Sequence, residues 1–219
     1  RYLKGRWVLP SKSYEDNFAT DTTERYHVGS AIGGATTAYG VYDANSLKFT
    51  IPGTVNVAVS LKSYKFVEGE RYFEITLPSS ANTGDRYGLL FNGEYVGSNV
   101  SLFELYRDAT EWKARYINNV SCWTTPATNE VSLTGIEVST LTKFKVQLDY
   151  THGVGYGYIW QGDVEPTTPT LKFYFSPRTD GDKFKVLMRS NAGEKIVRLN
   201  CISIRAESIV GRTNVEVTE

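Results

Sequence analysis

The sequence feature that most constrains the fold is a strict alternation of apolar residues with other residues in short runs. Between Val55 and Leu61, every second residue is a branched aliphatic one, and the residues between them are Asn, Ala and Ser. Successive side chains of a β-strand point to opposite faces, so a period of two places these apolar groups on one face. The run therefore predicts a strand with one buried face.

Similar runs follow along the rest of the chain, separated by the Gly, Pro, Asn and Asp residues that are typical of turns. They cover residues 71–77, 87–91, 100–107, 111–117, 144–150, 154–160, 171–175, 184–188 and 196–205. In the last run the alternation changes phase near Cys201, which predicts a β-bulge there. This series of short strands predicts an all-β fold, a two-sheet antiparallel jelly-roll sandwich over residues 46–207.

The first 45 residues do not share this alternation. A polar stretch from Ser11 to Thr23 is followed by the small-residue segment Gly29 to Ala35. We expect residues 1–45 to form an irregular N-terminal arm or connecting segment, and residues 208–219 to form a C-terminal tail. Because residue 1 is Arg rather than Met, we expect the chain to be a piece of a longer or processed protein.

Composition narrows the classes of function. The 15 Tyr, 10 Phe and 4 Trp residues suit half-buried strands. The 24 basic and 24 acidic side chains cancel, which argues against nucleic acid as a partner, because nucleic-acid-binding proteins carry a basic excess. No apolar run approaches the roughly 18 residues of a membrane helix, so we expect no membrane insertion.

The sequence predicts no metal or cofactor. Cys122 and Cys201 lie far apart, and two free thiols are favoured over a disulfide, which stays open as the alternative. Two Cys and two His without close spacing do not indicate a zinc site. Asp180 and Asp182 flank a Gly, which fits a hairpin turn better than a calcium site.

Two of the predicted strands resemble strands of SPRY domains. The segment Gly69 to Ile75 (GERYFEI) is similar to the G-x-x-Y-F-E strand of that family, and Phe144 to Tyr150 (FKVQLDY) resembles its G-V-x-L-D strand. As in SPRY domains, a turn and an aromatic strand follow, here ending near Gly162. The Gly that usually precedes the second strand is Thr142 or Lys143 in this chain. The resemblance spans roughly residues 46 to 205.

SPRY domains are jelly-roll sandwiches related to the concanavalin A-like lectins and glucanases. The resemblance implies a binding module whose loops contact a peptide, a protein or a glycan, without catalytic residues common to the family. Similar sandwiches also occur in bacteriophage tails and capsids, and this analogy alone leads us to expect a virion-associated protein.

No catalytic constellation is recognisable. A glucanase of this architecture needs Glu-x-Asp-x-x-Glu on one strand, whereas the nearest string, Glu104 to Glu111, has the wrong spacing. There is no Gly-x-Ser-x-Gly elbow for a nucleophile. His27 lies in the irregular arm, and His152 lies in a Thr-His-Gly turn that favours an exposed loop residue over a general base. We therefore expect no enzyme activity.

The residues from Val154 to Trp160 form the most informative segment. Strand alternation places Tyr156, Tyr158 and Trp160 on one face and glycines on the other. If the aromatic stripe faces solvent, it is a flat platform on which sugar rings stack. If it faces inward, the glycines let another segment approach closely, and the frequency of aromatics in sandwich interiors favours this alternative.

Two further aromatic residues are candidates for ligand contact. Trp123 lies in a predicted loop, where an exposed Trp is unusual, and Tyr95 lies near the tip of another loop. The complete set of predicted ligand-binding residues is Trp123, Tyr156, Tyr158, Trp160 and Tyr95.

We therefore expect a non-catalytic binding or structural module of a larger assembly, such as a phage tail fibre, receptor-binding or decoration component at a virion or extracellular surface. The expected partners are a glycan, a host-surface receptor or neighbouring structural subunits, in a homo-oligomer or a larger assembly. The alternative is a polysaccharide-active enzyme, a lyase or a glycoside hydrolase on a jelly-roll scaffold. Its signature is Tyr, His, Arg and carboxylate groups that converge on one concave sheet face.

Overall fold

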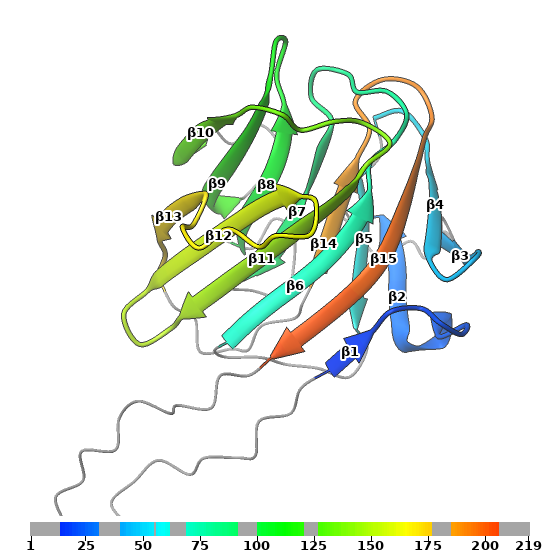
Figure 1. Cartoon of the computed structure of the whole chain (residues 1–219), viewed down its shortest axis with the longest axis horizontal. Coiled ribbons are helices and arrows are strands. Elements are labelled where there is room, and N and C mark those ends of the chain that lie inside the picture. Colours follow the sequence, from blue (N-terminus) through cyan, green and yellow to red (C-terminus); the bar gives the residue numbers. More distant parts are fainter. Residues whose placement is uncertain are drawn as a thin grey trace, which may run out of the picture.

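Two antiparallel β-sheets packed face to face make up the described part of the chain, as Figure 1 shows. The structure, a computed structural model, describes residues 14–30, 40–54, 56–61, 69–91, 100–120, 127–176 and 185–205. Within these ranges there is one short 3-10 helix, η1 (Thr23–Arg25), and no α-helix. The predicted all-β antiparallel sandwich is confirmed.

Sheet A has eight strands. They are β1 (Tyr14–Asp16), β3 (Gly40–Tyr42), β4 (Leu47–Ile51), β6 (Gly69–Thr76), β11 (Leu141–Asp149), β12 (Val154–Gln161), β13 (Leu171–Tyr174) and β15 (Lys195–Arg205). Their order in space is β13-β12-β11-β6-β15-β4-β3. The long strand β15 pairs with β4 through its first residues and with β1 through its last ones.

Sheet B has seven strands. They are β2 (Tyr26–Ser30), β5 (Asn56–Leu61), β7 (Arg86–Phe91), β8 (Val100–Arg107), β9 (Trp112–Val120), β10 (Asn129–Leu133) and β14 (Lys185–Arg189). Their order is β10-β9-β8-β7-β14-β5-β2. Strand β14 thus lies between β5 and β7, although it is far from both in sequence. Its pairing with both strands joins β5 and β2 to the rest of the sheet.

The strands predicted from residue 55 onward are present, with ends that differ by a few residues. The bulge near Cys201 is also confirmed, because the register of β15 against β6 shifts between Leu199 and Cys201. Cys201 is a thiol, whereas Cys122 and the Asp180–Asp182 turn lie outside the described residues. Strand β10 was not predicted, and its first four residues are exposed.

The N-terminal segment differs from the irregular arm that its sequence suggested. Strand β1 pairs with β15 of sheet A, β2 pairs with β5 of sheet B, and β3 pairs with β4 of sheet A. Asp16 fixes the start of this segment, because its carboxylate accepts hydrogen bonds from the hydroxyls of Thr22 (2.6 Å) and Tyr26 (2.8 Å). The described part of residues 1–45 therefore belongs to both sheets.

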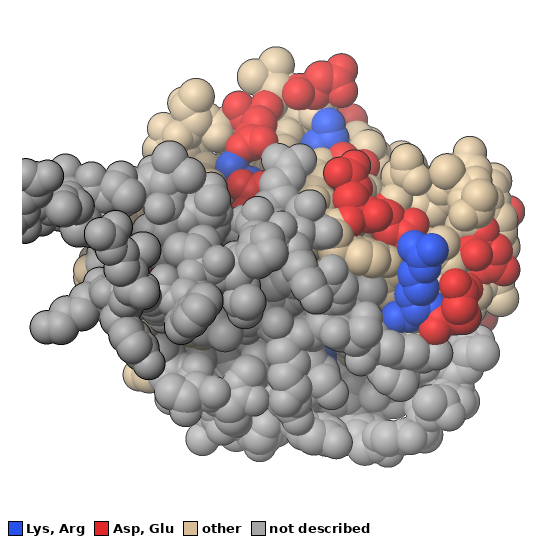
Figure 2. Space-filling view, turned by 90° about the horizontal axis from the view of Figure 1, so that it is seen from below, with Lys and Arg blue, Asp and Glu red and all other residues tan. Residues whose placement is uncertain are grey.

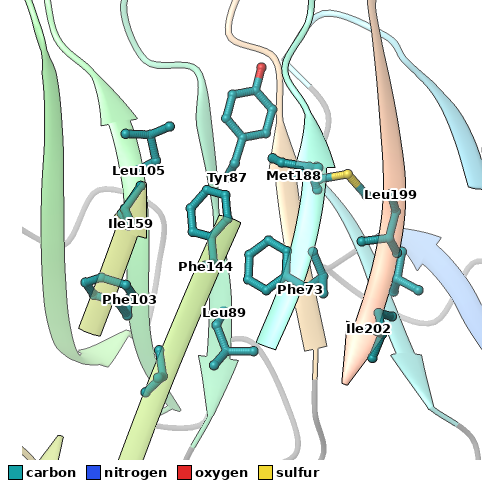
Figure 3. Close-up of a cluster of buried hydrophobic side chains, with 14 of the residues drawn as sticks. Phe73, Tyr87, Leu89, Phe103, Leu105, Phe144, Ile159, Met188, Leu199 and Ile202 are labelled. Atoms are coloured by element: carbon teal, nitrogen blue, oxygen red, sulfur yellow. The ribbon is translucent and has the colours of Figure 1, made fainter. Parts of the chain in front are cut away.

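The core lies between the sheets and is rich in aromatic rings. Phe73 of β6 and Phe144 of β11 stack with their centroids 4.4 Å apart, and they face Tyr87 and Leu89 of sheet B (Figure 3). All four side chains are at most 1% exposed. Burial of each such side chain stabilises the fold by about 2 kcal/mol. The inward-facing residues of the strands therefore supply most of the favourable free energy of folding.

The described surface carries both signs of charge side by side. Figure 2 shows acidic side chains next to basic ones over the described part of the lower face. Lys113, for example, lies 3.1 Å from a carboxylate oxygen of both Asp108 and Glu130. This mixing agrees with the formal net charge of zero. The described part of the chain contains no apolar helix of membrane-spanning length.

Candidate functional site

Strand β12 presents its aromatic side chains on the outer face of sheet A, the face turned away from sheet B. Its glycines face inward, because a Cβ at Gly155 would lie 2.1 Å from the ring of Phe173 and a Cβ at Gly157 would lie 2.4 Å from the ring of Phe103. The aromatic residues alternate with these glycines and therefore share the outer face. They are Tyr156, Tyr158 and Trp160.

Of the two orientations left open by the sequence, the structure thus has the outward one, and core packing between the sheets is not observed for this stripe. Only Ile159 of this part of β12 joins the main core cluster. Tyr158 and Trp160 are nevertheless just 8% and 9% exposed. Neighbouring side chains of sheet A cover them.

Polar groups contribute to this cover above Tyr158. The ammonium of Lys145 lies 4.1 Å from the centre of the Tyr158 ring, and the Tyr158 hydroxyl donates to Oε1 of Gln147 (3.3 Å). Lys145 also pairs with Glu165 of the β12–β13 loop, which crosses in front of β12 and β11 in Figure 1. This ion pair holds the loop close to the outer face.

Trp160 lies deeper under this cover. Its ring centroid is 6.0 Å from that of Tyr72 in β6. The indole Nε1 is buried and has no hydrogen-bond partner among the described residues. A buried N–H without a partner is unfavourable, and the same burial keeps this donor out of contact with solvent. Tyr158 and Trp160 form a covered floor that continues along β12 from the more exposed Tyr156.

The exposed part of the stripe lies at the edge of sheet A. Lys172 of β13 pairs directly with Tyr156 of β12, and its ammonium lies 5.7 Å from the Tyr156 ring centre and 5.4 Å from that of Tyr174. Tyr174 is 65% exposed. We call these three residues, Tyr156, Lys172 and Tyr174, the aromatic surface. It presents two rings and one cation to solvent.

A histidine lies in the turn between β11 and β12. Nδ1 of His152 is 2.6 Å from Oδ2 of Asp149, and both side chains are largely exposed. The hydrogen bond from His152 is the main cause that lowers the pKa of Asp149. The prediction of an exposed loop histidine is confirmed, and no described nucleophile pairs with it.

A second polar group, which sequence reasoning did not single out, lies on the outer face of sheet B. Strand register places Arg86 beside Tyr106 and beside Arg189, and it places Glu104 beside Arg115. Nε of Arg86 and Nε of Arg115 lie 3.8 Å and 3.7 Å from the two carboxylate oxygens of Glu104. We call Arg86, Glu104, Arg115 and Arg189 the arginine cluster.

Glu104 is the centre of this cluster and is 0% exposed. It lies over Gly88, where a Cβ would be 2.7 Å from the Glu104 Cβ. Burial raises the pKa of Glu104, whereas the charges of Arg86, Arg115 and Arg189 act in the opposite direction. The Arg115 guanidinium lies 4.0 Å from the centre of the Tyr106 ring, so the aromatic ring supports the cation from one side.

The remaining predicted ligand-binding residues are not placed. Trp123 and Tyr95 lie outside the described residues, and so does Cys122. Strand β2 includes His27, whose side chain is likewise outside the description. The structure therefore brings together three of the five predicted binding residues, all from one strand.

Comparisons with known proteins identify the fold. No family model matches the chain, and no curated protein matches it. Among solved structures, the exoplasmic/lumenal domain of VIP36 in its Ca2+- and Man3GlcNAc-bound form superposes with a TM-score of 0.66 at 6% identity, covering 90% of each chain. The chain has a legume-lectin-like fold.

Two other solved structures agree. The winged bean acidic lectin in complex with methyl-α-D-galactose gives a TM-score of 0.64 at 8% identity, covering 90% of this chain and 99% of the lectin. A legume lectin-like domain from Entamoeba histolytica gives 0.64 at 7% identity, covering 84% and 91%. The likeness spans nearly the whole sandwich and supports the concanavalin A-like resemblance.

The VIP36 structure carries calcium, so we tested whether the described residues suit such an ion. Calcium requires six to eight oxygen ligands, mostly carboxylates and carbonyls. No group of three or more His, Cys, Asp or Glu side chains in the described ranges is arranged to hold a metal. The described residues therefore do not fit a calcium site.

Proposed function

We propose that the chain is a non-catalytic glycan-binding module and that the aromatic surface of sheet A contacts the sugar. The observation that carries the proposal is the outward orientation of the β12 stripe, which leaves Tyr156, Lys172 and Tyr174 accessible at one edge of a lectin-like sandwich. Tyr158 and Trp160 continue the same face of β12 beside this surface.

The chemistry of the surface suits a saccharide. The C–H groups of a sugar ring stack on an aromatic face, and tyrosine hydroxyls exchange hydrogen bonds with sugar hydroxyls. The Lys172 ammonium lies between the two tyrosine rings, where it is able to donate hydrogen bonds to the ring oxygen or the hydroxyl oxygens of a sugar. Its pKa is raised, and the hydrogen bond with the Tyr174 hydroxyl is the largest cause. The cation therefore stays charged at neutral pH.

The comparisons support the sugar class without identifying a sugar. One neighbour is a lectin with methyl-α-D-galactose, and another is a domain with Man3GlcNAc. These ligands belong to those proteins. For this chain, the likeness makes a glycan the preferred ligand over a peptide or another protein.

The test is a glycan array with the purified chain, followed by titration calorimetry with the strongest glycan. We expect binding that weakens about tenfold in Tyr174→Ala, because loss of a stacked ring removes roughly 1–2 kcal/mol. Val41→Ala is the control, since Val41 is also exposed (57%) but lies on β3 at the other edge of sheet A. An array without any bound glycan contradicts the proposal.

One observation favours the alternative, a polysaccharide-active enzyme. On the outer face of sheet B, Tyr106, two arginines and Glu104 converge, which is most of the expected signature of such a site. Glu104 is fully enclosed, however, so no atom of a polysaccharide reaches its carboxyl group in this arrangement. Incubation with a polysaccharide panel, read for reducing ends and unsaturated products, tests this reading, and turnover would establish it.

The biological context stays a prediction. The likenesses to lectins do not support a phage virion origin, and the virion or extracellular location and a homo-oligomeric or larger assembly are untested. The glycan-binding proposal depends on none of these, because the aromatic surface belongs to a single chain.

A further inference from the structure

The arginine cluster on sheet B has more positive than negative charge. Three guanidinium groups surround the carboxylate of Glu104, and the charges of Arg115 and Arg189 alone exceed its charge by +1. Of the other carboxylates near it, Glu130 lies 3.8 Å from Nε of Arg115, but it is half-exposed and also pairs with Lys113. Buried cations require a counter-charge, so the cluster is suited to receive a further anion.

The cluster also has donors that the described residues leave unused. Arg115 is 9% exposed, and its Nε faces the carboxylates of Glu104 and Glu130 at 3.7 and 3.8 Å without a hydrogen bond; Nε of Arg189 is likewise buried without one. Among the described residues, Arg189 makes one side-chain hydrogen bond, a long one of 3.4 Å from Nη2 to Oδ1 of Asn191. Burial and the neighbouring charge of Arg86 lower the pKa of Arg189, which indicates that the guanidinium groups repel one another.

Tyr106 and Arg189 are the more accessible residues of this region. Both are partly exposed, whereas Arg86 and Arg115 are buried and Glu104 is enclosed. The Tyr106 ring lies 4.0 Å from the Arg115 guanidinium and 5.4 Å from that of Arg86. A ligand that enters here meets an aromatic ring and several planar donor groups together, which is the combination that suits a sugar ring with an attached oxyanion.

We propose that the arginine cluster is a second binding site, on the sheet opposite the aromatic surface, for the oxyanion of an acidic saccharide, either a carboxylate or a sulfate group. Arg115 and Arg189 bind the oxyanion, Tyr106 packs against the sugar ring, and Glu104 orients the guanidinium groups from below. The saccharide part of this inference rests on the proposed glycan-binding function, whereas the oxyanion part rests on the cluster itself.

The test compares an acidic glycan with its neutral form. Oligogalacturonate and its methyl ester share the sugar chain and differ in the carboxylate, which the ester neutralises with a methyl group, and dextran sulfate with dextran provides the matching sulfate pair. We expect the acidic member of at least one pair to bind about tenfold or more tightly than the neutral member, because charged hydrogen bonds are each worth that much or more. Raising the salt concentration is expected to weaken this binding.

Variants locate the site. Arg115→Gln and Arg189→Gln are each expected to reduce the affinity for the acidic glycan about tenfold. Arg25→Gln, which removes the same charge from the exposed helix η1, is expected to leave it unchanged. If Arg115→Gln does not fold, as judged by circular dichroism, the half-exposed Arg189 decides the outcome. Wild-type affinity in Arg189→Gln would overturn the inference.

The two proposals fail in different ways. If acidic and neutral glycans bind equally and the binding depends on Tyr174, the oxyanion site is refuted and the glycan-binding function stands. If no glycan binds, the proposed function is refuted. Arginine-dependent binding of dextran sulfate but not of oligogalacturonate supports the site and identifies the group as a sulfate.

Discussion

Gly157 of β12 and Phe103 of β8 lie in direct contact across the sandwich, and a Cβ at Gly157 would be 2.4 Å from two carbons of the Phe103 ring. Because of this contact, the glycine side of β12 faces sheet B. The aromatic side of the same strand therefore faces away from sheet B, and the proposed glycan site depends on this orientation.

Gly157→Ala is expected to destabilise the fold by about 1–3 kcal/mol, because the added methyl group overlaps a ring that is 0% exposed. Urea unfolding followed by tryptophan fluorescence measures the change. Thr168→Ala, in the exposed β12–β13 loop, is the control and is expected to change stability by less than about 0.5 kcal/mol. Equal stability of the two variants would contradict the inward orientation of Gly157.

Trp160→Ala is expected to lower the free energy of unfolding by about 3 kcal/mol, since the ring is 9% exposed and packs against Tyr72. The sequence left two orientations open for this ring and favoured the inward one; on a solvent-facing platform its truncation would leave stability nearly unchanged. The paired measurement is Tyr174→Ala, whose ring is 65% exposed and whose loss is expected to cost little stability. Similar melting temperatures for both variants would show that Trp160 is not part of the covered floor.

Glu104→Gln is expected to destabilise the protein by about 3–5 kcal/mol, because it removes the carboxylate that two buried arginines face. Glu130→Gln is the matched control: its side chain is 44% exposed and its loss is expected to change stability by no more than about 0.5 kcal/mol. Chemical denaturation of both variants checks this. A Glu104→Gln protein as stable as wild type would mean that the cluster does not need this charge.

Asp108 links stability to pH. The backbone N–H groups of Glu111 and Thr110, each 2.8 Å from Oδ1, hold the pKa of Asp108 well below its ordinary value of 3.8. A lowered pKa means that the ionised group stabilises the folded state above pH 3.8 and that this contribution is lost as the pH falls below that value.

Asp108→Asn is therefore expected to be less stable than wild type at neutral pH, with a difference that shrinks as the pH is lowered to about 2. Urea unfolding at several pH values measures it. Asp163→Asn, whose side chain is fully exposed, provides the comparison. A difference between wild type and Asp108→Asn that stays constant over this range would disprove the assignment.

The fold was largely predictable because it depends on local alternation. The strands after residue 55 repeat the period of two that their burial requires, with the exception of β10, whose first four residues are exposed. Even the bulge between Leu199 and Cys201 appears as a change of phase. The N-terminal strands β1 and β3 are only three residues long and lack an apolar run. Their pairing with β15 and β4 depends on contacts distant in sequence, which no local pattern reports.

The site was predictable only in part. Alternation shows that Tyr156, Tyr158 and Trp160 share one face, but the direction of that face depends on Phe103 and Phe173, which come from other strands. The arginine cluster was hidden for a similar reason. Arg86 and Arg189 become neighbours only because β14 inserts between β5 and β7.

The most direct test of the central claim is the affinity of Tyr156→Ala and Tyr156→Phe for the strongest glycan of the array, measured by titration calorimetry with Val41→Ala as control. If the outward ring of β12 stacks on the sugar, Tyr156→Ala loses about tenfold or more in affinity, whereas Tyr156→Phe, which keeps the ring, stays within a few-fold of wild type. Wild-type affinity in Tyr156→Ala, with an unchanged melting temperature, would contradict the account.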